Sequence, residues 1–597
     1  MISPHVYGLC HEAQTVTSEI DSDPTDTPES IINRLYSGDK KHGYYTIYSE
    51  PPESQDPLQL AFECGRWGEQ KPSELFLQAF SDSLTCLDLD PMAGMVSPPL
   101  MGSHGVVPLT VVAPLVDIIR HCANLIVQAK REVFFVTCVW SPSVAQRMIR
   151  DALIELSRRA GLRGERVTTR IIFDQPSAWH TMESHQIIRP AAFASHHVQL
   201  PAPSEIPNLD IEVLSVHAVV LGTLHAKFCI VDREMATIMS NNVEDNANME
   251  MSVHLEGPIV ASVYDSALIT WKKGLNWTPA FAEKLVELHQ AKADAPPQPP
   301  RSVRDDEDIM REIAKEEEIY KPKEGETVLL AVNRQLNVAI KTPVKPSGPE
   351  IEREGLCPYI YTMTSHSVPM ALVSRPPYGG LDASSVNVPQ NEAWLSLVRH
   401  ATKSIFIQTP DLNAEPLLQA LSEALSRGIE VTYYVCFGYN DAGEMIAGQG
   451  GTNEQAAQRL LASLAPDGPE RQLLHIYNYV AKDQDHPIHH SFRARDCHVK
   501  LLIVDGAVGI QGSGNQDTQS WCHSQEINVM VDSPEICAKW RDGVELNQNT
   551  RAFGKVYADG IWRDAEGMPG EGYSGDPGVV GGIFRGVSGM IKKMSRQ

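Results

Sequence analysis

The sequence has few basic residues for its length. Its 597 residues include 51 Lys and Arg against 75 Asp and Glu, which gives a formal net charge of −24 at pH 7. Proteins that bind nucleic acid without sequence preference depend on cationic side chains that neutralise phosphates. The overall charge therefore argues against a general nucleic-acid-binding protein, although it is compatible with a local basic site.

The sequence also lacks the cysteine patterns of disulfide-rich and zinc-binding domains. Its 11 Cys are an odd number and none are spaced as Cys-x-x-Cys, so we expect no disulfide framework and a reducing intracellular compartment. The N-terminus has no cationic start followed by an apolar run, as a signal peptide would. The most apolar stretch, residues 105–119, is short and interrupted by Pro108 and Pro114. We therefore predict no transmembrane helix, and a cytoplasmic or peripherally membrane-associated protein.

Changes in composition divide the chain into five segments. Residues 1–105 contain five basic and 16 acidic residues and are predicted to form an acidic N-terminal extension. Two repeats at 106–290 and 350–566 are separated by a Pro-rich and highly charged linker at 291–349, in which any helix is expected to be mostly solvated. Residues 567–597 form a Gly-rich tail that ends in a basic amphipathic segment.

The two repeats contain the same order of predicted elements. Each repeat begins with a helical segment, followed by a buried strand, a second helix and a second strand. The predicted strands and helices are 115–130, 132–140, 144–158 and 167–174 in the first repeat, and 392–402, 403–409, 414–427 and 429–437 in the second. Alternation of helix and strand predicts an α/β sandwich, present twice.

Each repeat then contains the pattern His-x-Lys-x4-Asp. A Ser lies eight residues after the Asp, an Asn follows two residues after the Ser, and a Glu follows the Asn. The residues are His225, Lys227, Asp232, Ser240, Asn242 and Glu250 in the first copy, and His498, Lys500, Asp505, Ser513, Asn515 and Glu526 in the second. A single His-x-Lys-x4-Asp could arise by chance, whereas two in matching positions of a repeat indicate a functional pair.

The residue types in this pattern suit a phosphodiester. Residues i and i+2 of a strand face the same side, so the His and Lys of each copy are predicted to project together. Lys, Ser and Asn side chains can donate hydrogen bonds to an anion, and a Glu on a neighbouring strand can hold a His ring nitrogen and fix its tautomer. Together they predict an anion pocket with a nucleophile and a proton donor.

These duplicated motifs resemble those of the phospholipase D superfamily over about residues 110–275 and 350–550. The segment 405–421 is most similar to the cardiolipin synthase branch and related phosphatidyltransferases. The Asp of each motif differs from the residue that tyrosyl-DNA phosphodiesterases carry there. The resemblance implies two pseudo-symmetric α/β sandwich domains that form one shared active site in a monomer, with no metal and no cofactor.

The resemblance also implies a role for each residue. His225 would attack phosphorus and form a phosphohistidine, and His498 would protonate the leaving alcohol. The phosphate would be bound by Lys227, Lys500, Asn242, Asn515, Ser240 and Ser513. Glu250 and Glu526 would each orient the His of their own copy, and Asp232 and Asp505 would be more structural than catalytic. The first copy departs from the family because Met239 replaces the usual Gly before Ser240.

The implied reaction is cleavage of a phospholipid phosphodiester with water or an alcohol as acceptor. The alternatives are a nuclease-type phosphodiesterase of the same superfamily and a catalytically silent scaffold, which the intact His and Lys of both copies make less favoured. Residues 579–597 contain four basic and no acidic residues, and their apolar residues fall on one helical face. This pattern predicts peripheral contact with an anionic membrane, with a frayed or intramolecularly docked tail as the alternative.

Overall fold

The computed structural model describes residues 1–36, 56–275 and 307–575, apart from residues 353, 363–365, 447 and 574. The predicted basic segment 579–597 and the Pro-rich run at 296–300 lie outside the described residues. Within the described residues, no helix combines the length and the apolar character needed to cross a membrane.

The first half of the chain forms a mixed sheet in the order β5-β3-β2-β7-β8-β9-β1. The pairs β5–β3 and β3–β2 are parallel and the remaining pairs are antiparallel. The strands are β1 (Gly102–Pro114), β2 (Glu132–Val136), β3 (Val167–Phe173), β5 (Leu209–Ala218), β7 (Phe228–Val231), β8 (Met235–Met239) and β9 (Asn248–Glu256).

The second half repeats this order as β14-β13-β12-β16-β17-β18-β11. The first two pairs are again parallel and the others antiparallel. The strands are β11 (Val368–Leu372), β12 (Ser404–Gln408), β13 (Glu430–Val435), β14 (Leu474–Asn478), β16 (Leu501–Val504), β17 (Val508–Gly512) and β18 (Asn528–Asp532). The predicted α/β class is confirmed, and the same strand order occurs in both halves.

Strand β1 connects the two sheets. Its first residues, 102–105, pair with β11 of the second half, and its later residues, 106–114, pair with β9 of the first. This single strand thus joins the edge strand β9 of the first sheet to the edge strand β11 of the second.

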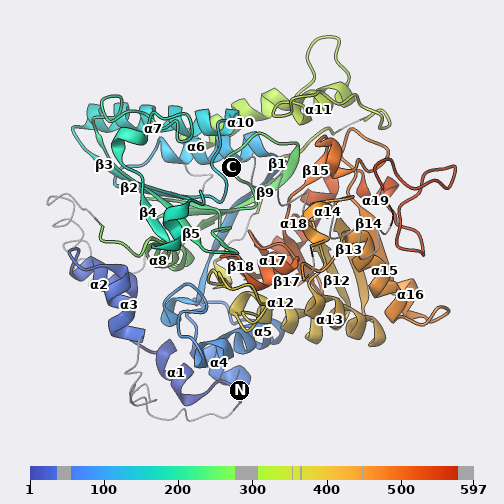
Figure 1. Cartoon of the computed structure of the whole chain (residues 1–597), viewed down its shortest axis with the longest axis horizontal. Helices are drawn as coiled ribbons and strands as arrows, with labels where there is room; N and C mark the ends of the chain where they lie inside the picture. The colour runs from blue at the N-terminus through green and yellow to red at the C-terminus, as the bar shows by residue number, and fades with distance from the viewer. Residues whose placement is uncertain are drawn as a thin grey trace.

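Helices cover both faces of the first sheet. In Figure 1, α6 (Leu115–Ile126) and α7 (Val144–Arg163) lie side by side along the top of the first half. They pack with Val133 and Phe135 of β2, whereas Phe134 of the same strand contacts the Trp271 ring of α8 (Ile259–Trp271) on the other face. Burial on both faces explains why β2 is a continuous hydrophobic run and does not alternate with polar residues.

Local sequence signals set the limits of these helices. Ser143 precedes α7 and its side chain accepts a hydrogen bond from the backbone N–H of Gln146, and Gly164 ends the helix with a φ of 70°. A Ser before the first turn and a Gly after the last are the preferred caps because they satisfy otherwise unpaired backbone groups. The helices of the second half are α12 (Pro389–His400), α13 (Glu415–Ser426), α15 (Asn453–Ser463) and α18 (Pro534–Leu546).

The acidic N-terminal segment contributes to the core. Its helices, at the lower left of Figure 1, are α1 (Pro4–Cys10), α2 (Val16–Ser22), α3 (Pro28–Tyr36), α4 (Pro57–Glu63) and α5 (Glu74–Thr85). Thr17 donates from its backbone and hydroxyl to Asp265 of α8 (2.8 and 2.7 Å), and the Ser73 hydroxyl donates to Asp532 of β18 (2.9 Å). This segment is therefore bonded to both halves of the chain.

The charged segment between the repeats also forms helices, α10 (Glu307–Tyr320) and α11 (Val328–Leu336). Ile309 and Ile313 of α10 are buried against the first half, and the Tyr359 hydroxyl donates to Glu316. Most other described residues of α10 are exposed, as expected for so charged a helix, and two isoleucines one turn apart anchor its single buried face.

The remaining described elements are short. They are β4 (His185–Ile187), β6 (Gly222–Thr223), β10 (Tyr359–Tyr361), β15 (Asp496–Cys497), α14 (Asp441–Glu444), α16 (Glu470–Leu473), α17 (Thr518–Cys522), α19 (Thr550–Phe553) and 3-10 turns at Cys86–Asp88, Pro98–Leu100, Ala178–Thr181, Pro190–Ala192 and His490–Phe492.

Candidate active site

The two His-x-Lys segments lie where the halves meet. Each segment precedes a strand and does not lie within one, because its backbone pairs with the opposite half. His225 comes before β7 and its N–H donates to the carbonyl of Gln525 (2.9 Å), and His498 comes before β16 and its N–H donates to the carbonyl of Met249 (2.8 Å). The strand predicted to carry both His and Lys thus begins one residue after the Lys.

Two short parallel pairings position these segments. Leu224, just before the first motif, forms an isolated bridge with Gln525. In the second copy, β15 (Asp496–Cys497) pairs with the start of β9. Each His is therefore placed beside the strand or loop of the other copy that carries a Glu.

The histidines and glutamates pair across the two copies. Nδ1 of His225 lies 2.7 Å from Oε1 of Glu526, and Nδ1 of His498 lies 3.2 Å from Oε2 of Glu250. The prediction that each Glu orients the His of its own copy is wrong. The reason is the parallel pairing between copies. It places Glu526, the residue after Gln525, next to His225 and Glu250, the residue after Met249, next to His498.

The two imidazole rings face one another. Their centroids are 6.4 Å apart and the ring planes are perpendicular. The His225 side chain is 15% exposed and the His498 side chain 5%, whereas both carboxylates are fully buried. Because Nδ1 of each ring contacts a carboxylate, Nε2 is the nitrogen left for chemistry in the space between the rings.

The serines of the two copies support the carboxylates. Ser240 donates to Glu250 and Ser513 donates to Glu526 from fully buried hydroxyls. A hydroxyl has a single proton to donate, so neither serine also donates to a phosphate in this arrangement. The predicted phosphate-binding role of Ser240 and Ser513 is therefore corrected to a positioning role, which follows from antiparallel strands that place each Ser beside its Glu.

Met239 leaves the geometry of the first copy unchanged. The backbone N–H of Ser240 donates to the Met251 carbonyl and that of Ser513 donates to the Ile527 carbonyl, both at 2.9 Å. The departure from the family pattern before Ser240 is thus accommodated in the same strand register.

Each carboxylate accepts one further hydrogen bond, from a residue that the motif did not reveal. Ser520 Oγ donates to Glu526 Oε1 (2.7 Å), and Asn248 Nδ2 donates to Glu250 Oε1 (3.2 Å). These side chains fix both oxygens of each carboxylate, and therefore fix the orientation of the two rings.

The motif lysines are buried beside the histidines. Nζ of Lys227 donates to the His225 carbonyl and Nζ of Lys500 donates to the His498 carbonyl, both at 2.7 Å. An ammonium has three N–H groups, so the bond to the carbonyl uses only one of the three on each Lys.

Burial and mutual repulsion set the charge of these basic groups. Burial lowers the pKa of His225 and of Lys227. Burial, together with Lys500, lowers the pKa of His498 to about 4, and burial lowers the pKa of Lys500 to about 7. In the ligand-free site at neutral pH, both rings are therefore in the uncharged form that can act as nucleophile or base.

The carboxylates remain ionised. Burial would raise the pKa of Glu250, but His498 and Lys500 hold it below its ordinary value. His225 and Lys227 do the same for Glu526. An ionised carboxylate accepts the Nδ1–H of the neutral ring, which leaves a lone pair on Nε2.

The two asparagines are held by acidic neighbours. Asn242 Nδ2 donates to Glu244 Oε1 (2.8 Å), and Asn515 Nδ2 donates to Asp517 Oδ2 (3.2 Å). The spacing Asn-x-acid occurs in both copies, so comparing the copies could have identified Glu244 and Asp517 from sequence.

The Asp of each motif lies away from this site. Each carboxylate accepts hydrogen bonds from consecutive backbone N–H groups at the start of the neighbouring strand. Asp232 accepts from residues 130, 131 and 132 at the start of β2, and Asp505 accepts from 402, 403 and 404 at the start of β12. Asp232 and Asp505 are thus placed to hold the sheet together, and neither contacts a motif histidine.

Tyr439 is a further aromatic neighbour of the site. Its ring stacks on His498 with 6.1 Å between centroids and approaches His490 at 4.6 Å. No spacing relates Tyr439 to the motif, so only the fold reveals it.

Residues 395–545 match the family model described as cardiolipin synthase, PLD-like domain. The chain carries a phospholipase D-like domain. The match includes His498, Lys500, Asp505 and Glu526, and it confirms the resemblance to the phospholipase D superfamily. A comparison with curated protein sequences found no match.

Several solved structures are similar to this chain at low sequence identity. Phosphatidylserine synthase from Haemophilus influenzae Rd KW20 is 12% identical with a TM-score of 0.45, over 83% of this chain and 94% of that one. Nuc from Salmonella typhimurium, a phospholipase D family member, is 17% identical with a TM-score of 0.22, over 32% of this chain and 97% of that one.

Proposed function

We propose that the chain is a phospholipase D-type enzyme that cleaves a phospholipid phosphodiester through a phosphohistidine and passes the phosphatidyl group to water or an alcohol. The observation that carries the proposal is the crossed pair of histidines, each oriented by a buried carboxylate, with two buried lysines beside them. A site with two imidazoles and no exposed carboxylate suits displacement at phosphorus in two steps.

In the first step, Nε2 of His225 attacks phosphorus, the N–P bond forms and the P–O bond to the leaving alcohol breaks. His498 gives its Nε2 proton to that oxygen. In the second step, His498 removes a proton from water or an alcohol, whose oxygen attacks phosphorus and releases His225. Glu526 stabilises the positive charge that develops on the His225 ring.

The substrate phosphate itself would prepare the acid. Burial and Lys500 lower the pKa of His498 to about 4 in the ligand-free site, so the ring needs a nearby negative charge to hold a proton at neutral pH. A bound phosphodiester supplies that charge. The free N–H groups of Lys227, Lys500, Asn242 and Asn515 would bind its non-bridging oxygens.

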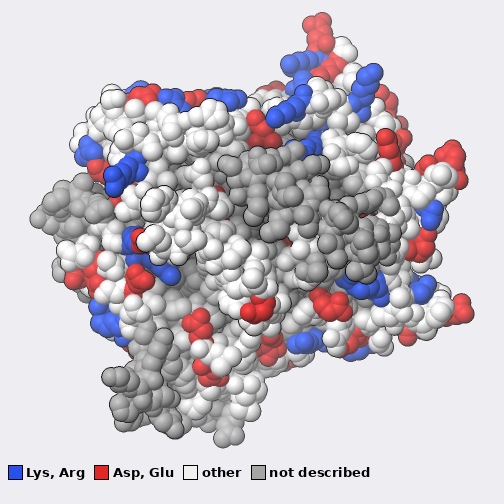
Figure 2. Space-filling view, in the orientation of Figure 1, with Lys and Arg blue, Asp and Glu red and all other residues white. Residues whose placement is uncertain are grey.

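Charge favours lipid over nucleic acid as the substrate. The net charge is −24, and on the face drawn in Figure 2 the acidic and basic side chains of the described residues are intermixed and form no continuous basic track. We propose that the enzyme acts as an intracellular monomer, because one chain supplies both motif copies, and that residues 579–597 contact an anionic membrane.

A panel of phospholipids, assayed with and without added alcohol, tests the reaction, with single-stranded DNA as a parallel substrate. We expect lipid cleavage that His225→Ala and His498→Ala abolish and that His196→Ala, at an exposed histidine outside the site, leaves unchanged. Mass spectrometry of the trapped intermediate should find the phosphoryl group on His225. Cleavage of DNA alone would overturn the lipid assignment, and full activity of either site variant would overturn the proposed chemistry.

A further inference from the structure

Three buried carboxylates form a cluster next to the active site. Asp411 follows β12, Glu444 ends α14, and Asp517 precedes α17. Their relative exposures are 1%, 2% and 4%. One carboxylate oxygen from each lies within 4.8 Å of the corresponding oxygens of the other two.

The polar neighbours of the cluster satisfy two of the three carboxylates. Glu444 accepts from the side-chain amides of Asn413 and Asn440. Asp517 accepts from the Asn515 amide (3.2 Å) and from the backbone N–H of Ser520 (2.6 Å).

Asp411 is different. Both of its carboxylate oxygens are buried and neither has a hydrogen-bond partner among the described residues. Burial and the neighbouring Asp517 carboxylate raise the pKa of Asp411 well above its ordinary value, and Lys500 only partly opposes them. A buried carboxylate without a donor, facing two other carboxylates, is unfavourable unless a cation or a proton compensates it.

We propose that Asp411, Glu444 and Asp517 bind a hard divalent cation, Ca²⁺ or Mg²⁺. Both ions take carboxylate oxygens as ligands, and the cluster offers three carboxylates with no nitrogen or sulfur among them. The cation would neutralise the group and give Asp411 the partner that the protein does not supply. The family resemblance implied no metal, and the sequence pattern did not reveal this cluster because its acids are separated by more than 30 residues.

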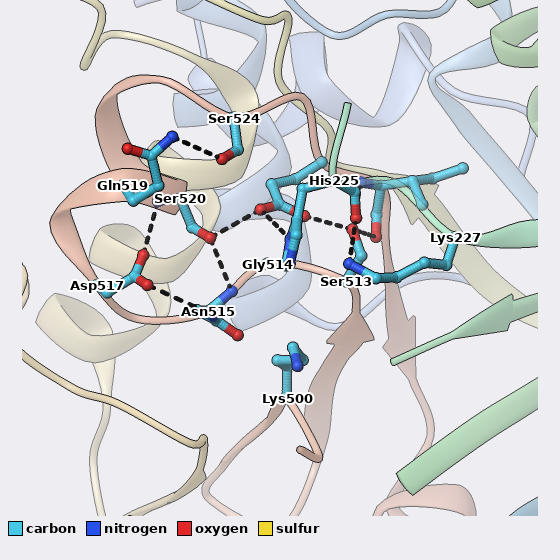
Figure 3. A network of polar contacts seen from close by, with 12 residues as sticks. His225, Lys227, Lys500, Ser513, Gly514, Asn515, Asp517, Gln519, Ser520 and Ser524 are labelled. Carbon is cyan, nitrogen blue, oxygen red and sulfur yellow. Dashed lines mark hydrogen bonds and ion pairs between the residues drawn. The ribbon is translucent and has the colours of Figure 1, made fainter. Parts of the chain in front are cut away.

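The cation would position the catalytic centre without touching the substrate. Asp517 accepts a hydrogen bond from the backbone N–H of Ser520. Ser520 Oγ in turn donates to Glu526, whose carboxylate contacts His225. Figure 3 shows Asn515 and Asp517 before α17 and Ser520 in its first turn, with contacts leading from this segment toward His225. A cation bound to Asp517 would hold the start of α17, and therefore the carboxylate that orients the proposed nucleophile.

Calorimetry on the EDTA-treated full chain tests the proposal without reference to activity. Titration with CaCl₂ and with MgCl₂ should show one bound ion per chain for at least one of them, and a raised Tm. Asp411→Asn should weaken this binding by at least about 100-fold. Glu454→Gln is the matched control, since Glu454 is also a buried acid of the second half but lies outside the cluster.

Two results would overturn the proposal. One is the absence of binding by the wild-type protein up to about 10 mM of either salt, above the weakest Ca²⁺ sites known. The other is unchanged binding in both Asp411→Asn and Glu444→Gln. Glu444→Gln is included so that the test still stands if Asp411→Asn does not fold. A higher Tm for cation-free Asp411→Asn, without wild-type binding, would show instead that Asp411 and Asp517 share a proton. None of these outcomes depends on the proposed lipid reaction.

Discussion

The crossed pairing of histidines and glutamates makes a prediction that separates the two catalytic steps. Glu526 is fully buried and its Oε1 lies 2.7 Å from His225 Nδ1. A hydrogen bond to such a charged group contributes about 1.5–3 kcal/mol. Glu526→Gln keeps the size and one acceptor oxygen but removes the charge that stabilises the ring as it becomes positive. We expect kcat to fall about 10- to 100-fold, since about 1.4 kcal/mol corresponds to a factor of ten.

The assay compares two leaving groups. Choline from phosphatidylcholine needs a proton to leave, whereas p-nitrophenol from the corresponding phosphatidyl ester leaves as a stable anion. The burst of product release reports the first step alone. Glu526→Gln weakens the nucleophile, so its burst should be slow with both substrates. Glu250→Gln removes the charge that helps His498 to hold its proton, so fewer molecules carry the protonated acid. Its burst should be slow with phosphatidylcholine and close to wild type with the p-nitrophenyl ester.

The opposite result would refute the crossed arrangement. If each Glu served the His of its own copy, Glu250→Gln would be slow with both leaving groups and Glu526→Gln only with choline. The position of the phosphoryl label, measured separately, identifies the nucleophile. A label on His225 together with this reversed pattern would show that Glu526 does not act on His225 in solution.

Three further predictions concern charge, stability and the tail. Because the pKa of Lys500 is about 7 in the free site and a bound anion raises it, binding takes up a proton above that pH. The affinity for a methylphosphonate monoester should then fall as pH rises from 7 to 9, by at most about tenfold per pH unit, and a flat profile by calorimetry would contradict this. Asp505→Asn should lower the free energy of unfolding by about 1–3 kcal/mol in urea, with kcat unchanged. The pKa of Asp505 is lowered by the hydrogen bonds from residues 402–404 despite partial burial, so its stabilising effect is present above the pKa of a free Asp and should be lost as pH falls below it; an equal loss at all pH values would count against this role. Deletion of residues 579–597 should reduce sedimentation with anionic liposomes and leave cleavage of a soluble short-chain substrate unchanged, and unaltered sedimentation would exclude the tail as the membrane contact.

The repeated helix and strand order was predictable because each element has a local cause. Apolar runs such as Val133–Val136 are buried on both faces of a sheet, and Ser143 and Gly164 carry the cap signals of the helix between two strands. The second copy shows the same order, so the α/β class followed from sequence alone.

The N-terminal segment and the segment between the repeats were less predictable. High charge correctly indicated that most of α10 is exposed, but it did not indicate that Ile309 and Ile313 are buried, or that Thr17 and Ser73 bond to carboxylates more than 200 residues away. Composition averages over a segment, whereas burial depends on a few apolar positions and on the partner that meets them.

The sequence by itself determined which chemical groups the site contains. Two His and two Lys at repeated spacing, each followed by a Glu, indicated a site for an anion with an acid–base pair. Only the tertiary structure decided how they pair, placing Glu526 on His225 and Glu250 on His498, and how Asp411, Glu444 and Asp517 come together. Spacing along the chain specifies which residues of one copy lie close together. It does not specify which strand of the other copy becomes the neighbour, because that depends on backbone hydrogen bonds formed when the two halves pack.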